Sequence, residues 1–156
     1  MKENITLYVM KDNTINELKL ISFLKQIDNI FPVSLSQKVN IEDYAKKQLT
    51  HGVVICADIS GKIVGILLGY ANDTLNKRAY IGTIGIVTEC QSKGIGKKLI
   101  DEMKQYSKKM GMDKIGLHTH KTNSGAIRFY TREGFRQISE LNSERKDDVY
   151  LEFGLL

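Results

Sequence analysis

Apolar and polar residues alternate along the chain with two different periods. A period of two predicts a strand, because successive side chains of a strand point to opposite faces, whereas a period of three to four predicts a helix. The first pattern predicts strands at 5–9, in two runs of 52–73 joined by a turn at 60–61, and at 79–88, 114–120, 135–139 and 147–153. The second pattern predicts helices at 14–31, 41–49, 94–110 and 124–133.

The ends of the first two predicted helices carry local signals. Thr14 and Glu17 have the spacing of a capping box, and Pro32 ends the helix that follows. Asn40 is the expected N-cap of the second helix, which stops at Gly52. The first helix is expected to bury one stripe of apolar residues, at positions 15, 18, 21, 24 and 27. The helix at 94–110 is expected to bury Ile95, Leu99, Met103, Tyr106 and Met110.

The order of the predicted elements is β-α-α-β-β-β-α-β-α-β-β. Strands and helices mixed in this way predict an α/β (α+β) fold, in which the helices pack on a mixed sheet. No repeat and no Pro/Gly/Ser-rich linker interrupts the chain of 156 residues. We therefore expect a single domain, 1–156.

The composition of the chain bears on its expected cellular compartment. The chain is 42% hydrophobic and 26% charged, which is ordinary for a folded globular protein. No window approaches the roughly 18 apolar residues of a membrane span, and the first residues lack the pattern of a signal peptide. A cytoplasmic location is therefore expected.

The cysteines and histidines predict no metal site. Cys56 and Cys90 are far apart and have no CxxC partner, so two free thiols in a reducing compartment are expected. His51, His118 and His120 do not complete a zinc-ligand set with them. His118 and His120 share one face of a predicted strand, but no further ligand is recognisable beside them.

Net charge points to an anionic partner. The charge is +5 and the isoelectric point is near 9.1, which suits nucleic acid, a phosphorylated cofactor or an acidic substrate. The lysines of 97–114 are interspersed with acids, and aromatic residues do not alternate with basic ones as in single-strand binders. A phosphorylated small molecule is therefore a better expectation than nucleic acid.

Two glycines stand where an apolar run gives way to a helix, in GTIGIVTECQSKGIGKKLIDEMK. Glycine lets the backbone approach an anion closely, and the first N–H groups of a helix point toward such a group. Lys93, Lys97 and Lys98 add positive potential. Gly94 and Gly96 therefore favour a phosphate site, although a helix start that merely tolerates glycine has the same pattern.

Two common phosphate loops are excluded by single residues. A Walker loop requires glycine at 91 and serine or threonine at 98, where the chain has Gln91 and Lys98. A dinucleotide fingerprint requires a third glycine at the position of Leu99. A nucleotide triphosphatase is therefore not expected.

The loop QSKGIG resembles the Gln/Arg-x-x-Gly-x-Gly/Ala signature of the GCN5-related N-acetyltransferase (GNAT) superfamily. The second signature of that family, Asn-x-x-Ala-x-x-x-Tyr-x-x-x-Gly-Phe, matches Asn123, Ala126, Tyr130, Gly134 and Phe135. The resemblance covers about 50–140. It implies a mostly antiparallel mixed sheet of about six to seven strands flanked by about four helices, with a cofactor-binding core at about 79–135.

The resemblance also implies acetyl-CoA as cosubstrate. In the family, backbone amides of the glycine loop hold the pyrophosphate, while the preceding strand pairs with the pantetheine arm and polarises the thioester. Carried onto this chain, the expected cofactor-binding residues are Ile86, Val87, Gln91, Ser92, Lys93, Gly94, Ile95, Gly96, Lys97 and Asn123. Asn123 also suits a helix N-cap. Tyr130 is the expected general acid, since the thiolate that leaves must take up a proton.

The general base is harder to assign. The strand at 79–88 carries no carboxylate, where many relatives have a glutamate. Asp73 and His120 are the candidates, Glu89 matches a position usually at the surface, and a water relay or an already deprotonated amine stays open. Together with Tyr70 and Tyr80, Asp73 and His120 are also the expected substrate-binding residues.

These residues predict an N-acetyltransferase acting on a primary amine of a small molecule, such as an amino sugar or an amino acid. The alternatives are acyl transfer to a macromolecule (a protein amine or aminoacyl-tRNA) and a non-catalytic module that binds coenzyme A. A monomer and a homodimer both fit the sequence.

Overall fold

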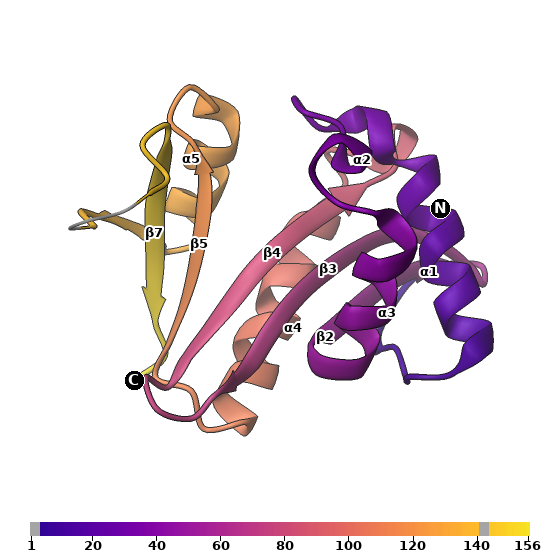
Figure 1. Ribbon diagram of the computed structural model, residues 1–156, viewed down its shortest axis with the longest axis horizontal. Helices are drawn as coiled ribbons and strands as arrows, with labels where there is room; N and C mark the ends of the chain where they lie inside the picture. The colour runs from indigo at the N-terminus through magenta and orange to yellow at the C-terminus, as the bar shows by residue number, and fades with distance from the viewer. Residues whose placement is uncertain (1–3, 141–143) are drawn as a thin grey trace.

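One mixed sheet runs through the computed structural model, which describes residues 4–140 and 144–156 (Figure 1). Within those residues its strands are β1 (Ile5–Val9), β2 (Val53–Ile59), β3 (Lys62–Asp73), β4 (Arg78–Ile86), β5 (Lys114–His120), β6 (Arg136–Ile138) and β7 (Asp148–Gly154). They lie in the order β1-β2-β3-β4-β5-β7-β6. Every neighbouring pair is antiparallel except β4 and β5, which are parallel. The predicted mixed, mostly antiparallel sheet is confirmed.

The helices cover the two faces of this sheet. They are α1 (Thr14–Gln26), α2 (Leu35–Lys38), α3 (Ile41–His51), α4 (Ile95–Lys109) and α5 (Ser124–Arg132), with short 3₁₀ turns at Asp28–Ile30 and Thr88–Cys90. Gly65 of β3 lies against Leu99 of α4, whereas Gly85 of β4 lies against Ile27 on the opposite face. α4 and α5 therefore cover one face, and α1 to α3 cover the other.

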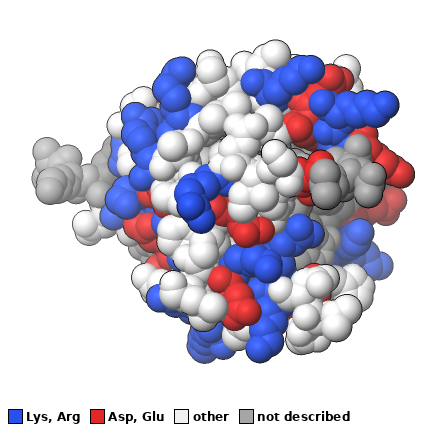
Figure 2. Space-filling model, turned by 90° about the vertical axis from the view of Figure 1, so that its left-hand side faces the viewer, with Lys and Arg blue, Asp and Glu red and all other residues white. Residues whose placement is uncertain are grey.

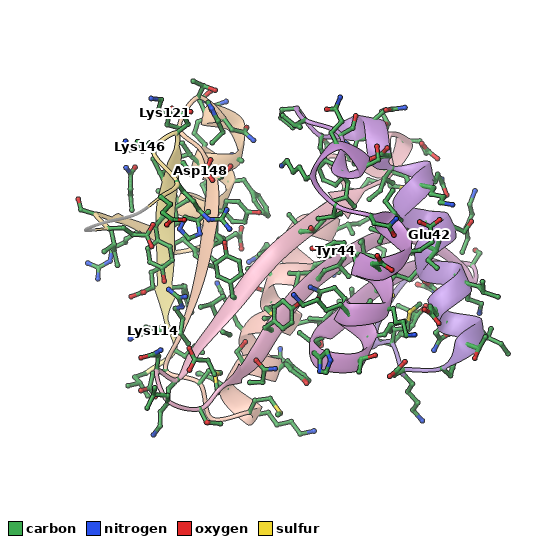
Figure 3. All side chains as sticks on the ribbon, in the orientation of Figure 1. Glu42, Tyr44, Lys114, Lys121, Lys146 and Asp148 are labelled. Atoms are coloured by element: carbon green, nitrogen blue, oxygen red, sulfur yellow. The ribbon has the colours of Figure 1, made fainter. Side chains whose placement is uncertain are left out.

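The sheet opens between its two parallel strands. Pairing of β4 with β5 ends at Ile81 and Leu117. The register of β4 against β3 shifts at Gly82, the extra residue of a β-bulge, which bends a strand and increases its twist. Beyond this point the two strands diverge (Figure 1). The backbones of the two strands thus separate in a V, which is called the gap below; it is narrow near Lys114 and wide near Asp148, both labelled in Figure 3.

Three expectations about the first helix are wrong. Asn13, not Thr14, is the N-cap, because its side chain accepts a hydrogen bond from the Asn16 N–H at 2.8 Å. Ile15 and Leu18 are 69% and 63% exposed. A strict three-residue spacing turns steadily around a helix of 3.6 residues per turn, so a stripe that ends at the buried Leu24 and Ile27 begins on the exposed side of the helix. The helix also ends at Gln26 rather than at 31.

Smaller corrections concern α4 and α2. Met110 is the C-cap of α4 and is 47% exposed, so its predicted burial is wrong, while Ile95, Leu99 and Met103 are buried as expected. The four-residue helix α2 is too short to leave a helical period in the sequence. None of the helices in the described part of the chain is long and apolar enough to cross a membrane.

Candidate active site

The glycine loop ends β4 and begins α4. Gly94 is the N-cap of α4 and has a left-handed backbone, with φ of 78°, and Ser92 has φ of 68°. No side chain caps this helix. Its first backbone N–H groups are therefore free of a capping side chain, which is the arrangement that binds an anion.

Gly96 allows the start of α4 to approach α5. A Cβ atom on Gly96 would lie 3.1 Å from Cζ of Phe129. The Ile95 side chain is buried, so only the backbone of this residue is available for binding in the loop. Lys97 pairs with Glu133 at 3.3 Å and Asp101 at 3.5 Å, which ties its ammonium group to α4 and to the end of α5.

The unpaired edge of β4 presents one backbone donor beside the loop. The Val87 N–H already donates to the Val64 carbonyl of β3 at 2.9 Å. Because backbone groups alternate between the two sides of a strand, the Ile86 N–H faces the V-shaped gap. The Ile86 carbonyl accepts a hydrogen bond from the Gln91 side chain at 3.2 Å. Of the two donors suggested by the sequence, Ile86 is the one on the open edge.

Tyr130 is a buried residue of α5. Its ring packs against Phe129 and Phe135, with centroids 5.1 and 5.7 Å away, and the residue is 7% exposed. The described residues give its hydroxyl no hydrogen bond, yet that oxygen is not among their fully buried unsatisfied atoms. Burial raises the pKa of Tyr130, so the phenol keeps its proton at neutral pH.

Asn123 caps α5, as the sequence suggested. Its side-chain oxygen accepts a hydrogen bond from the Ala126 N–H at 3.2 Å. The cap orders the start of the helix that carries Tyr130.

The structure does not bring Asp73 or His120 to the site as bases. Asp73 is bonded to the backbone and side chain of Asn76 in the β3–β4 turn, at the narrow end of the gap. These hydrogen bonds lower the pKa of Asp73, which makes it a weaker base. His120 is exposed, and its Nδ1 is 2.7 Å from the Thr122 hydroxyl in the turn that follows β5.

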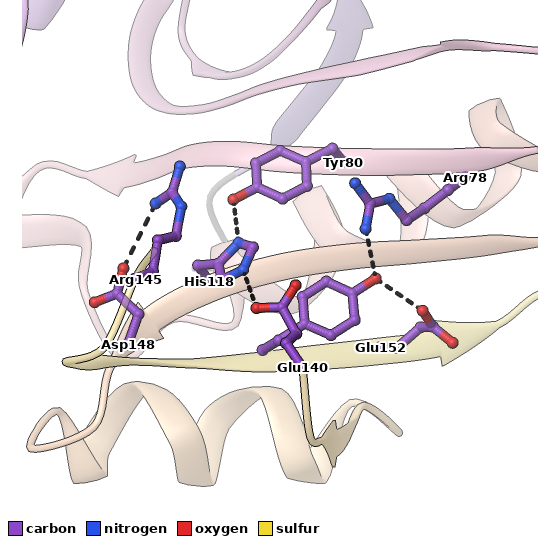
Figure 4. A network of polar contacts seen from close by, with 8 residues as sticks. Arg78, Tyr80, His118, Glu140, Arg145, Asp148 and Glu152 are labelled. Carbon is purple, nitrogen blue, oxygen red and sulfur yellow. Dashed lines mark hydrogen bonds and ion pairs between the residues drawn. The ribbon is translucent and has the colours of Figure 1, made fainter. Parts of the chain in front are cut away.

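His118 occupies the gap instead (Figure 4). Its Nδ1 is 2.6 Å from the Tyr80 hydroxyl, and its Nε2 is 2.7 Å from a carboxylate oxygen of Glu140. The sequence analysis considered His118 only as a possible metal ligand and predicted no metal site. The available signal was its place on the polar face of β5, but the pairing of Tyr80 with Gly116 that brings the two side chains together is tertiary.

Arg78 and Tyr150 lie beside this pair, and Figure 4 labels Arg78 next to Tyr80. The Arg78 guanidinium lies 5.8 Å from the Tyr80 ring and 5.5 Å from the Tyr150 ring, and donates to the Tyr150 hydroxyl at 3.3 Å. That hydroxyl donates to Glu152 at 2.7 Å. Burial raises the pKa of Tyr150 to about 12. A side chain at Gly116 would collide with this ring, so glycine is required there.

Two more tyrosines lie on the same face of the sheet. Tyr44 of α3 projects toward β4, and its hydroxyl is 2.8 Å from the Thr83 hydroxyl (Figure 3). Tyr70 pairs with Tyr80 across β3 and β4 and thus shares its face. Burial raises the pKa values of Tyr44, Tyr70 and Tyr80, so all three are hydrogen-bond donors at neutral pH.

No group of three potential metal ligands occurs among residues 4–140 and 144–156. The groups described at the gap are backbone N–H groups, phenols, an imidazole and a carboxylate. This set suits acyl and proton transfer.

Comparison with known proteins identifies the protein family to which this chain belongs. Residues 21–135 match the acetyltransferase (GNAT) family. The chain is 30% identical to the probable N-acetyltransferase san of Drosophila melanogaster, over 74% of this chain and 62% of that protein. It is 32% identical to N-alpha-acetyltransferase 50 of Danio rerio, over 81% of this chain and 73% of that protein. The chain thus spans somewhat less than two thirds of the fly protein.

Solved structures agree in fold. An acetyltransferase of the GNAT family from Staphylococcus aureus Mu50 has a TM-score of 0.76 at 21% identity, covering 97% of this chain and 100% of that one. A putative streptothricin acetyltransferase from Bacillus anthracis in complex with acetyl coenzyme A has a TM-score of 0.58 at 26% identity, covering 67% and 62%. The chain belongs to the GNAT family of acetyl-CoA-dependent N-acetyltransferases.

Proposed function

We propose that the protein transfers an acetyl group from acetyl-CoA directly to a primary amine in the gap between β4 and β5. The arrangement of two proton-transfer groups carries this proposal. Tyr130 approaches the gap from the face covered by α4 and α5, because Phe135 beside it contacts Phe153 on that face. Tyr80 and His118 approach from the opposite face, since side chains alternate along each strand.

Each residue has a separate role in the proposed reaction. Acetyl-CoA supplies the thioester, and the Ile86 N–H donates to its carbonyl oxygen, as an oxyanion-hole donor does. The amine nitrogen attacks the carbonyl carbon as the C–S bond breaks. The amine passes one proton to the Tyr80 oxygen while the proton of Tyr80 moves to Nδ1 of His118. The departing thiolate takes its proton from Tyr130, which solvent restores.

The backbone loop from Gln91 to Gly96 holds the diphosphate in this proposal. The left-handed residues Ser92 and Gly94 turn successive N–H groups toward one concavity, and the N-terminus of α4 adds positive potential. Asn123 at the start of α5 contacts the pantetheine arm. Lys97 contributes through its pairing of α4 with α5 rather than by direct contact.

The α-amine of a polypeptide is the acceptor that we favour. Its support is the similarity to N-alpha-acetyltransferase 50, which extends over 81% of this chain. A small amine such as an amino sugar or an amino acid is the second candidate, because the hydroxyls of Tyr44, Tyr70 and Tyr80 gather on the acceptor face. Aminoacyl-tRNA is disfavoured, since basic and acidic side chains alternate over the face shown in Figure 2.

A thiol-release assay tests the acceptor. Purified protein with acetyl-CoA is offered short peptides with a free N-terminus, the same peptides with a blocked N-terminus and an internal lysine, amino sugars and free amino acids. We expect turnover only where the peptide α-amine is free. Turnover on amino sugars or amino acids alone would overturn the polypeptide acceptor. Binding of acetyl-CoA without thiol release for any amine would indicate a non-catalytic module.

Gly94→Asp is expected to weaken acetyl-CoA binding at least about tenfold, measured by calorimetry, because a carboxylate would face the diphosphate. Gly111→Asp is the matched control. Gly111 lies beyond the opposite end of α4, has φ of 82°, and like Gly94 has nothing within 4 Å of a Cβ atom. The two variants therefore share the same backbone strain and charge. Equal affinities in the two variants would contradict the assignment of the loop.

A further inference from the structure

Glu140 contacts the His118 ring at Nε2, the ring nitrogen that Tyr80 does not contact. It follows β6 directly, in the connection that leads to β7. One of its oxygens is 2.7 Å from Nε2 of His118. The Glu140 side chain is 31% exposed and that of His118 is 10% exposed. The imidazole is thus enclosed, whereas the carboxylate reaches the surface of the gap.

This contact determines which nitrogen of His118 carries the proton. An ionised carboxylate only accepts hydrogen bonds, so Nε2 must donate to Glu140. In the neutral ring Nδ1 is then an acceptor, and the Tyr80 hydroxyl donates to it at 2.6 Å. The reverse tautomer would place the Nε2 lone pair against the carboxylate, and the Tyr80 hydroxyl would have to accept from Nδ1–H instead of donating to it.

We propose that Glu140 is a positioning residue for proton transfer in this protein. It fixes His118 as the Nε2–H tautomer, so that Nδ1 is ready to receive the Tyr80 proton, and it stabilises the imidazolium that then forms. The inference rests on the proposed function of His118 for its effect on turnover. The proposed effect of Glu140 on the tautomer of His118 in the resting enzyme does not depend on acetyl transfer.

The other charged groups around the His118 ring do not take over the role of Glu140. β4 contributes Tyr80 and Arg78, whose positive charge disfavours an imidazolium. β7 contributes Tyr150 and two carboxylates, but Asp148 pairs with Arg145 at 3.5 Å and Glu152 accepts from Tyr150. Among the described residues, Glu140 is the carboxylate in hydrogen-bond contact with His118.

Glu140 also lines a cavity beside β6 and β7. A cavity of about 310 Å³ lies between the β6 and β7 ends and is lined by Glu140, Arg145, Asp148 and Tyr150, among others. The carboxylate therefore stands between this open space and the enclosed imidazole. The segment that follows β6 thereby contributes directly to the proton-transfer chain, and not only to the rim of the gap.

Glu140→Gln tests the proposal with three readouts. We expect kcat to fall at least about tenfold while KM for acetyl-CoA is unchanged. The acidic limb of the kcat/KM profile should move to lower pH, because the imidazolium loses its stabilising charge. In ¹⁵N NMR of the resting enzyme, His118 should change from the Nε2–H tautomer to a mixture, because a glutamine amide can donate as well as accept.

Two variants complete the test. Glu140→Asp keeps the charge and should recover the tautomer and most of the pH profile. Glu144→Gln removes the same charge from an exposed position in the same connection and should leave all three readouts unchanged. A Glu140→Gln enzyme with the wild-type tautomer and the wild-type acidic limb would overturn the proposal, as would equal effects of Glu144→Gln.

The outcomes separate this inference from the proposed function. A shifted tautomer in Glu140→Gln together with full activity of His118→Ala would keep the positioning contact and remove His118 from catalysis. An inactive His118→Ala with an unaltered tautomer in Glu140→Gln would keep the base and remove the role of Glu140.

Discussion

His118→Ala is expected to lower kcat by roughly 10²- to 10⁴-fold, the usual contribution of a positioned acid or base. The substitution removes the acceptor for the Tyr80 proton, so the amine loses its route for deprotonation. Acetyl-CoA affinity should stay within about twofold, since the loop and the β4 edge are untouched. Initial rates from thiol release and calorimetry with acetyl-CoA measure the two effects separately.

His120→Ala is the matched control for this experiment. It removes the same imidazole two residues along β5, where the ring is exposed and bonded to Thr122. We expect less than about a twofold change in kcat. Losses of equal size in the two variants, or a His118→Ala enzyme as active as the wild type, would contradict the assignment of His118.

Tyr130→Phe is expected to have the second large effect, a fall in kcat of about 10²-fold or more. The thiolate would then leave without a positioned proton donor. Folding should be retained, because the hydroxyl makes no hydrogen bond with a described residue and the ring keeps its contacts with Phe129 and Phe135. Single-turnover rates isolate the chemical step, and thermal unfolding reports stability.

Tyr8→Phe is the matched control for Tyr130→Phe. Tyr8 lies in β1, the edge strand at the other end of the sheet from Tyr130, and its hydroxyl donates to Asp58 at 3.1 Å. Its loss should cost stability and leave kcat nearly unchanged. A Tyr130→Phe enzyme whose chemical step proceeds at the wild-type rate would remove the acid role.

Local sequence features predicted much of the fold and part of the site. The element order, the caps at Asn40 and Asn123 and the break between β4 and α4 depend on neighbouring residues, so they are visible in the sequence. The first helix was mispredicted in detail, since an apolar residue such as Leu18 is buried only where a partner element covers it. The general base stays a prediction for a related reason, because Asp73 and His120 have the required chemistry but are bonded in turns of the chain, to Asn76 and Thr122.

The sequence by itself determined the order of the elements, the caps at Asn40 and Asn123 and the glycine break before α4, because these properties belong to single residues or short segments. The tertiary structure alone decided that His118, rather than His120, contacts Tyr80. That contact joins residues 38 positions apart, and the contact with Glu140 spans another 22. The register of β5 against β4 places His118 near Tyr80, and register depends on the packing of the whole sheet rather than on any one segment.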